Sequence, residues 1–203
     1  MPSEEDDGAA SIEDDSDAAN YEGPSLKVID YLISRNVDLI AKDINGCIPL
    51  HYACKHGAIK VVRLLLQHNE PDQIEVPDRD GLTPIMYAIK AGQVEVIRYL
   101  LDQGADVLRF DEHKNNVFHY ACQSGNFQVV EILENYCNEN LIQAGNLMKW
   151  CNHDGEIPLH YASAAGELEI VKRCLRMSEF YGLSCQGPAI TTSGIEFATI
   201  NFL

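Results

Sequence analysis

One short phrase occurs four times in this chain of 203 residues. It reads HYACKHG at residues 51–57, MYAIKAG at 86–92, HYACQSG at 119–125 and HYASAAG at 160–166. Each copy has a Tyr, an Ala directly after it, and a Gly four residues after that Ala. Successive Tyr residues are 35, 33 and 41 positions apart. A period in this range is typical of a solenoid, in which one structural unit stacks on the next.

Residues 43–69 show what a single copy predicts. The start, Asp43–Gly46, has the composition of a turn, because Gly readily adopts a positive φ and Asn tolerates it. Pro49 fits the first turn of a helix, and Gly57 suits a left-handed helix end. A second helix follows, with a broad apolar face from Val61 to Leu66. Neither helix is long enough to be stable alone in water, so each unit must pack on its neighbours.

The repeated unit resembles the ankyrin repeat, whose signature is Asp-x-x-Gly-x-Thr-Pro-Leu-His-x-Ala, then Gly, then Val-x-x-Leu-Leu, then Gly-Ala-Asp. Among the copies, GLTPIMYAIKAGQVEVIRYLLDQGADV at 81–107 matches this signature best, and the resemblance covers about residues 26–176. It implies an all-α solenoid of stacked helix–turn–helix units with β-turn or hairpin finger loops. In the fourth unit Lys114 replaces the turn Gly and Val117 replaces the Pro, so we expect that unit's first helix to begin less regularly.

The pattern divides the chain into three parts. Residues 1–23 form an acidic tail that we expect to be disordered, because it has almost no large apolar residues to bury. An ankyrin-repeat domain is predicted at 24–177, followed by an off-pattern tail at 178–203. The domain comprises a partial unit at 24–42, repeats at 43–77, 78–110 and 111–151 (with an insert), and a repeat at 152–177. The off-pattern ending favours the hypothesis that the chain is a fragment or an alternative product of a longer protein.

The 41-residue step places about eight extra residues between Leu133 and Cys151. We expect them to extend the second helix or the finger loop of the fourth unit, since insertions in repeats map to loops. Met148 and Trp150 lie in this insert. They are predicted to pack on the fifth unit, with an anchor for a partner as the alternative, because aromatic residues are enriched in binding hot spots.

The net charge of −16 argues against nucleic acids and anionic membranes as partners. Nucleic acids and anionic membranes are held largely by Lys and Arg, of which the chain has 15 against 31 acids. The N-terminal sequence lacks the basic and apolar regions of a signal peptide. Seven Cys without such a signal suggest reduced thiols. We therefore expect a monomer in the cytoplasm or nucleus that binds another protein, with neither nucleic acid nor membrane as a partner.

The repeated His and Cys residues do not predict an active site or a cofactor. Equivalent positions in successive units are about 8–10 Å apart, whereas zinc ligands lie ~2 Å from one ion. His51, His119 and His160 are therefore predicted to be structural, and the resemblance implies that such a His closes hydrogen bonds between neighbouring turns. Gly57, Gly92, Gly125 and Gly166 are expected to be structural as well. The cluster to check for a metal is His113, Cys151 and His153, although no metal site is predicted.

The recurring Tyr residues invite comparison with a ladder of rings for base stacking. They are Tyr52, Tyr87, Tyr120 and Tyr161. We interpret them instead as packing between units with the hydroxyl reaching an edge, which agrees with the acidic charge.

The ankyrin resemblance implies that partners contact the residues beside the turn Gly and just before the Gly that ends the first helix, on a concave face. These positions are Asn45, Cys47, Lys55, His56, Arg79, Asp80, Leu82, Lys90, Glu112, His113, Asn115, Gln123, Ser124, His153, Asp154 and Glu156, together with Ile44, Ala91, Ala164 and Ala165. The early units are basic here and the late units acidic. The function predicted is a non-catalytic protein-binding module, an adaptor, scaffold or inhibitor. The alternative is a regulatory segment of a larger enzyme, ion channel or ubiquitin-ligase subunit.

Overall fold

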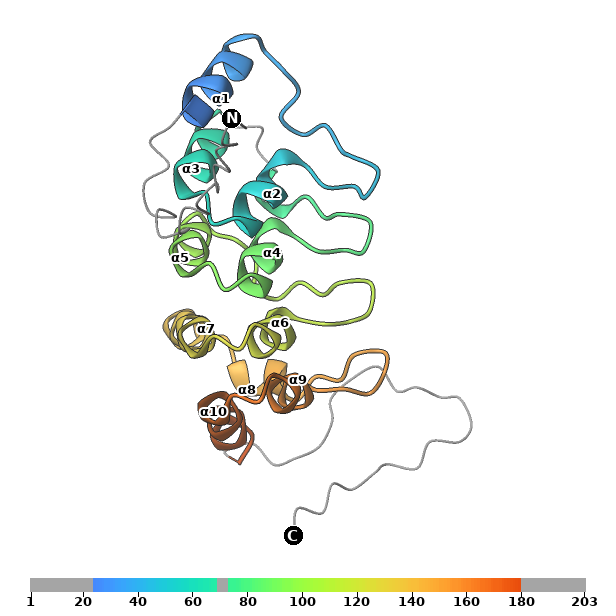
Figure 1. The fold of residues 1–203 in the computed structure, drawn as a ribbon. Helices are drawn as coiled ribbons and strands as arrows, with labels where there is room; N and C mark the ends of the chain where they lie inside the picture. Colours follow the sequence, from blue (N-terminus) through green and yellow to red (C-terminus); the bar gives the residue numbers. More distant parts are fainter. Residues whose placement is uncertain (1–23, 69–72, 180–203) are drawn as a thin grey trace, which may run out of the picture. The chain divides into compact units, whose positions relative to one another are not determined.

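The computed structural model describes residues 24–68 and 73–179 (Figure 1). The chain divides into two compact parts, 1–37 and 38–203. The first part contains α1 (Pro24–Ser34), which lies within the predicted partial unit at 24–42. The predicted acidic tail at 1–23, and residues 180–203 of the off-pattern tail, lie outside the described residues. Residues 178 and 179 belong to the last helix.

The second part is built from pairs of antiparallel helices that stack in two rows (Figure 1). The first row holds the short first helix of each unit, and the second row holds the longer helix that follows it. The first row contains α2 (Pro49–Lys55), α4 (Pro84–Lys90), α6 (Val117–Gln123) and α9 (Pro158–Ala165). The second row contains α3 (Ile59–Gln67), α5 (Val94–Asp102), α7 (Phe127–Glu139) and α10 (Leu168–Glu179). All regular elements in the described ranges are helical, which confirms the predicted all-α solenoid.

The apolar core runs between the two rows from one unit to the next. Equivalent side chains repeat in it: Leu65, Leu100 and Leu133 of successive second helices are all buried. The largest fully buried ring is that of Phe118 in α6. Because every unit buries its apolar face on its neighbours, stability is shared between adjacent units.

The first helix of the fourth unit begins as regularly as the others. Helices α2, α4 and α9 have Pro in the first turn, and α6 has Val117 there. In α6 the side chain of Asn116 accepts hydrogen bonds from the main-chain N–H of Phe118 (3.0 Å) and His119 (3.3 Å). This is an N-cap of the kind Asn favours. Lys114 takes the turn Gly's left-handed conformation with φ 64°. The expected irregular start was therefore wrong.

The insert lengthens the second helix of the fourth unit and adds a short helix. Helix α7 has 13 residues where α3 and α5 have nine, and α8 (Ala144–Met148) follows it. Met148 is buried in the core, and α8 contacts α10 of the fifth unit. The ring of Trp150 instead packs on Phe110, with centroids 4.8 Å apart. The extension of the second helix is as expected. The ring of Trp150, however, packs on Phe110 at the end of the third unit, whereas it was predicted to pack on the fifth.

Two glycines of the finger loops make a matched test of how tightly neighbouring loops approach. Gly81 and Gly155 both have a left-handed φ, +83° and +77°. A Cβ at Gly81 would lie 2.9 Å from the main-chain nitrogen of Glu112 in the next loop, whereas one at Gly155 would meet nothing within 4 Å. We expect Gly155→Ala to cost about 1 kcal/mol from backbone strain. Gly81→Ala should cost about 1–3 kcal/mol more, because the next loop must move. Urea unfolding of both variants measures the difference, and equal losses would contradict the close approach.

Candidate functional site

The finger loops are joined to one another by main-chain hydrogen bonds. The N–H of Arg79 donates to the carbonyl of Asn45 (2.9 Å), and that of Glu112 donates to Asp80 (2.8 Å). The N–H of His153 donates to the carbonyl of His113 (2.9 Å). These bonds connect the tips of successive loops beside the first-row helices (Figure 1). Main-chain hydrogen bonds therefore join the loops of the second to fifth units into one row in a common register.

Most of the residues predicted to bind a partner expose their side chains along this row and on the first-row helices. We call this surface the finger face. Its exposed residues are Asn45, Lys55, His56, Arg79, Asp80, Lys90, Glu112, His113, Gln123, His153 and Asp154, and its partly exposed residues are Ser124 and Glu156. Lys55, Arg79 and Lys90 make its early end basic, and Glu112, Asp154 and Glu156 make its late end acidic.

Three of the predicted contact residues have buried side chains. Cys47, Leu82 and Asn115 are 4%, 7% and 7% exposed. The Cys47 sulfur lies 3.2 Å from the Tyr87 hydroxyl of the next unit, and the Asn115 amide oxygen accepts a bond of 2.9 Å from Asn152. These residues occupy one equivalent position, which faces the neighbouring unit instead of solvent. The expectation that their side chains contact a partner is corrected accordingly.

Each first helix is tied to its own finger loop by a pair of side chains nine residues apart. The hydroxyl of Tyr52 donates to Asp43 (2.6 Å), and that of Tyr87 donates to Asp78 (2.7 Å). Tyr120 donates to the buried Asp111 in the same way. In the fifth unit Asn152 replaces the Asp, and its amide donates to the Tyr161 hydroxyl (3.1 Å). The recurring Tyr residues thus position the fingers, a role that the Asp-x8-Tyr spacing in the sequence could have indicated.

In each repeated His, Nδ1 bonds to the start of its own helix, and in His51 and His119 Nε2 lies against a carbonyl of the next unit. In His51, Nδ1 accepts the N–H of Ile48 (3.1 Å) and Nε2 lies 3.1 Å from the carbonyl of Leu82 in the next unit. The bonding fits a neutral ring that carries its proton on Nε2, a tautomer assigned from these partners. Burial lowers the pKa of His51, so the ring stays neutral. In the fifth unit Nδ1 of His160 accepts the N–H of Ile157 (2.9 Å).

The residues considered for metal binding do not assemble into a metal site. His113 and His153 meet through their main chains, and the side chain of Cys151 is buried. Within residues 24–68 and 73–179, no group of three His, Cys, Asp or Glu side chains is placed to hold an ion. In the same ranges no helix is long and apolar enough to cross a membrane.

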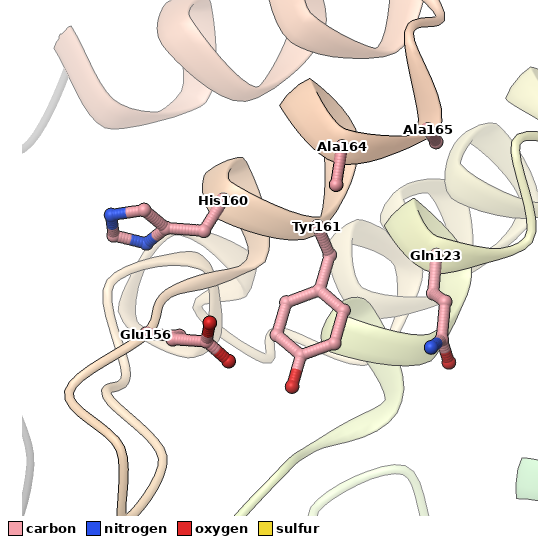
Figure 2. Close-up of a pocket in the computed structure, with 6 residues that line it drawn as sticks. All are labelled: Gln123, Glu156, His160, Tyr161, Ala164 and Ala165. Atoms are coloured by element: carbon pink, nitrogen blue, oxygen red, sulfur yellow. The ribbon is translucent and has the colours of Figure 1, made fainter.

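A pocket opens on the finger face between the fourth and fifth units (Figure 2). Its volume is about 340 Å³. The lining residues are Gln123 of α6, Glu156 of the last finger loop, and His160, Tyr161, Ala164 and Ala165 of α9. The Tyr161 side chain stands between those of Glu156 and Gln123 in this view (Figure 2). Burial, and after it the neighbouring Glu156 carboxylate, raises the pKa of Tyr161 to about 12, so its hydroxyl stays protonated.

Comparison with known proteins agrees with the predicted resemblance. A family profile described as ankyrin repeats (3 copies) matches residues 16–111, 70–143 and 109–181. The chain is 34% identical to Inversin of Gallus gallus over 140 residues, which is 69% of this chain and 12% of that protein. It is 29% identical over 140 residues to "Ankyrin repeat protein nuc-2" of Neurospora crassa, covering 69% of this chain and 12% of the relative. Over 150 residues it is 26% identical to human "Transient receptor potential cation channel subfamily A member 1", covering 74% of this chain and 13% of the relative. The chain thus spans about an eighth of the length of these relatives.

Proposed function

The chain belongs to the ankyrin-repeat family, whose repeats are protein–protein interaction modules, and from this premise we propose that it is a non-catalytic module that binds a protein partner on its finger face. The partner presents acidic groups to the second and third units and basic groups to the fourth and fifth. The module serves as an adaptor, scaffold or inhibitor.

The row of finger loops is the observation that carries this proposal. Main-chain bonds of 2.8–2.9 Å hold the loops in register, so the charged side chains between Lys55 and Asp154 are presented on a preformed surface. A preformed surface loses little conformational entropy when a partner binds. Its separated charges favour one orientation of the partner, because electrostatic complementarity fixes register and suppresses wrong partners.

A charge-reversal variant tests the proposal. Replacing Lys55, Arg79 and Lys90 by Glu should weaken partner binding at least about 100-fold, because like charges then face each other across the interface. Partners are captured from cell extract and identified by mass spectrometry, and the affinity of each is then measured by calorimetry. Circular dichroism verifies that the variant is folded.

The matched control makes the same charge change on the second-row helices. It replaces Lys60, Arg98 and Lys172 by Glu, and these exposed residues belong to α3, α5 and α10. The control should keep its partners. Partners that are retained by the finger-face variant, or lost equally by both variants, would contradict binding on the finger face.

A second candidate function is that of a regulatory segment within a larger enzyme, channel or ubiquitin-ligase subunit. It is favoured by the small share of the relatives' length, 12–13%, that the chain spans. An antibody to the repeat region should then detect a longer native protein.

We place the protein in the cytoplasm or nucleus as part of the same proposal. Its buried cysteines are free thiols, a form that these reducing compartments maintain; they are Cys47, Cys54, Cys122, Cys137 and Cys174. Fluorescence microscopy of the tagged chain tests the location.

A further inference from the structure

On the finger face, the ammonium group of Lys90 lies over the ring of Tyr120 in the next unit. The Nζ atom of Lys90, at the end of α4, lies 5.4 Å from the centroid of the Tyr120 ring in the next unit. This is within the range of a cation–π contact. A positive charge supplied by one unit therefore rests on the Tyr of the following unit.

One unit further on, this arrangement lacks its cation. The residue equivalent to Lys90, three positions after the recurring Tyr, is Gln123. The ring that follows is Tyr161, and the pocket of about 340 Å³ opens between them (Figure 2). Ala164 and Ala165, which occupy the positions of Lys55 and His56 in the second unit, leave the space unfilled. The pocket thus lies where the preceding repeat places an ammonium group.

The same pocket has a carboxylate that the preceding repeats lack. Glu156 occupies the position of Cys47, Leu82 and Asn115, and its side chain lines the pocket beside Tyr161 (Figure 2). One carboxylate oxygen accepts a bond of 3.2 Å from the Asn152 amide. The lining residues include neither Lys nor Arg. The pocket therefore combines an aromatic ring, a carboxylate and an amide around an open space.

We propose that this pocket binds the guanidinium group of an arginine side chain presented by the protein partner. The planar guanidinium stacks on an aromatic face and donates two parallel hydrogen bonds to a carboxylate, whereas an ammonium group is a compact and strongly hydrated charge. Tyr161 and Glu156 supply the ring and the carboxylate, and Gln123 offers an amide oxygen as a further acceptor. The inference rests on the proposed function and specifies which basic group the acidic end of the finger face recognises.

A titration with small probes tests the pocket without a known partner. Chain labelled with ¹³C in the alanine methyl groups is titrated with Nα-acetyl-L-arginine methylamide, because the Ala164 and Ala165 methyls line the pocket. These two signals should shift and saturate with a Kd on the order of millimolar, as for a small ligand. The neutral citrulline analogue and the lysine analogue should each bind at least about tenfold more weakly. Absent shifts, or equal affinity for either analogue, would overturn the proposal.

Three variants locate the binding. Gln123→Lys should abolish the shifts, since the new side chain places its own cation on Tyr161 as Lys90 does on Tyr120. Glu156→Gln should weaken binding about tenfold by removing the charge-assisted bonds. Glu131→Gln removes an exposed charge from α7, outside the finger face, and should leave the affinity unchanged. Unaltered binding to Glu156→Gln would also overturn the proposal.

The two proposals fail in distinguishable ways. If the probe does not bind but the charge-reversal variant loses its partners, only the arginine pocket is disproved. If the probe binds as expected but partners are retained by the charge-reversal variant, the pocket stands and the basic end of the finger face is not the docking surface.

Discussion

Asp111→Ala is expected to destabilise the protein by about 3 kcal/mol, although it removes only a small side chain from a loop. Asp111 is 2% exposed. Its carboxylate accepts hydrogen bonds from the main-chain N–H of Asn115 (2.7 Å), from the Asn115 amide (2.9 Å) and from the Tyr120 hydroxyl. Without it, buried donors of Asn115 and Tyr120 lose their acceptor, and each such loss costs about 1–3 kcal/mol. Urea unfolding measures the change.

The effect should extend across the boundary between the fourth and fifth units. The Asn115 amide oxygen accepts bonds from Asn152 (2.9 Å) and from the Tyr161 hydroxyl (3.3 Å), so Asp111 orients a group that holds the next unit. A double-mutant cycle with Tyr120→Phe separates the direct contact from the rest. We expect Asp111 and Tyr120 to be coupled, and a coupling energy near zero would contradict the pair.

Asp43 of the second unit is the matched control. Its carboxylate accepts the same kinds of bond, from the N–H of Asn45 (2.8 Å) and Cys47 (2.9 Å) and from Tyr52 (2.6 Å). Asp43 is exposed, however, and Tyr52 is 42% exposed. Water can replace the lost acceptor there, so Asp43→Ala should be clearly milder than Asp111→Ala. Equal losses would mean that burial does not determine the strength of this link.

The contrast between Asp43 and Asp111 shows which features the sequence could predict and which it could not. Periodicity within one unit predicted the helix pairs and the turn glycines, because those depend on nearby residues. The burial of Asp111 depends on how one unit sits on the next. The same is true of Cys47, Leu82 and Asn115, which precede the first helix in a position that reads as surface within a single unit but is covered by the adjacent one.

The repeat predicted that the finger loops lie in one row, but it did not predict the main-chain bonds that join them. The main-chain bonds from Arg79 to Asn45 and from Glu112 to Asp80 leave no sequence signal, since every residue except proline has both an N–H and a carbonyl. The pocket beside Tyr161 was missed because it depends on small or uncharged side chains. Two Ala and a Gln line it at positions where other units have Lys, His or Ser. The start of α6 was misjudged because the expectation considered Lys114 and Val117 and left out Asn116, which is a good N-cap.

Acidification from pH 7 to pH 5 is expected to remove about 2 kcal/mol of stability through His119 alone. In the buried ring of His119, Nδ1 accepts the N–H of Asn116 (3.1 Å) and Nε2 lies 3.2 Å from the carbonyl of Glu156 in the fifth unit. Protonation of Nδ1 would remove the acceptor of a buried N–H and bury a charge. Burial accordingly lowers the pKa of His119 from 6.5 to about 4.

The direction of the effect follows from which state binds the proton. Between pH 6.5 and pH 4 the unfolded chain is protonated at His119 and the folded chain is not. This contribution is therefore complete above pH 6.5 and is lost as the pH falls, at about 1.4 kcal/mol per pH unit. His51, whose pKa burial also lowers, adds a loss of the same sign. Above pH 5 most carboxylates remain ionised, so the histidines dominate the slope in this window.

The slope of unfolding free energy against pH separates the effect of His119 protonation from the stability that the neutral His119 ring contributes. His119→Gln is expected to be less stable than the parent at pH 7, but to lose about 2 kcal/mol less between pH 7 and pH 5, because it has no group to protonate. Urea unfolding at each pH gives the slope, and His56→Gln is the control at an exposed position. Should His119→Gln be unfolded, NMR titration of the parent chain still decides, since the His119 ring signals should not titrate above pH 5. A folded-state pKa near 6.5 would show that the two units are not joined through a neutral His119.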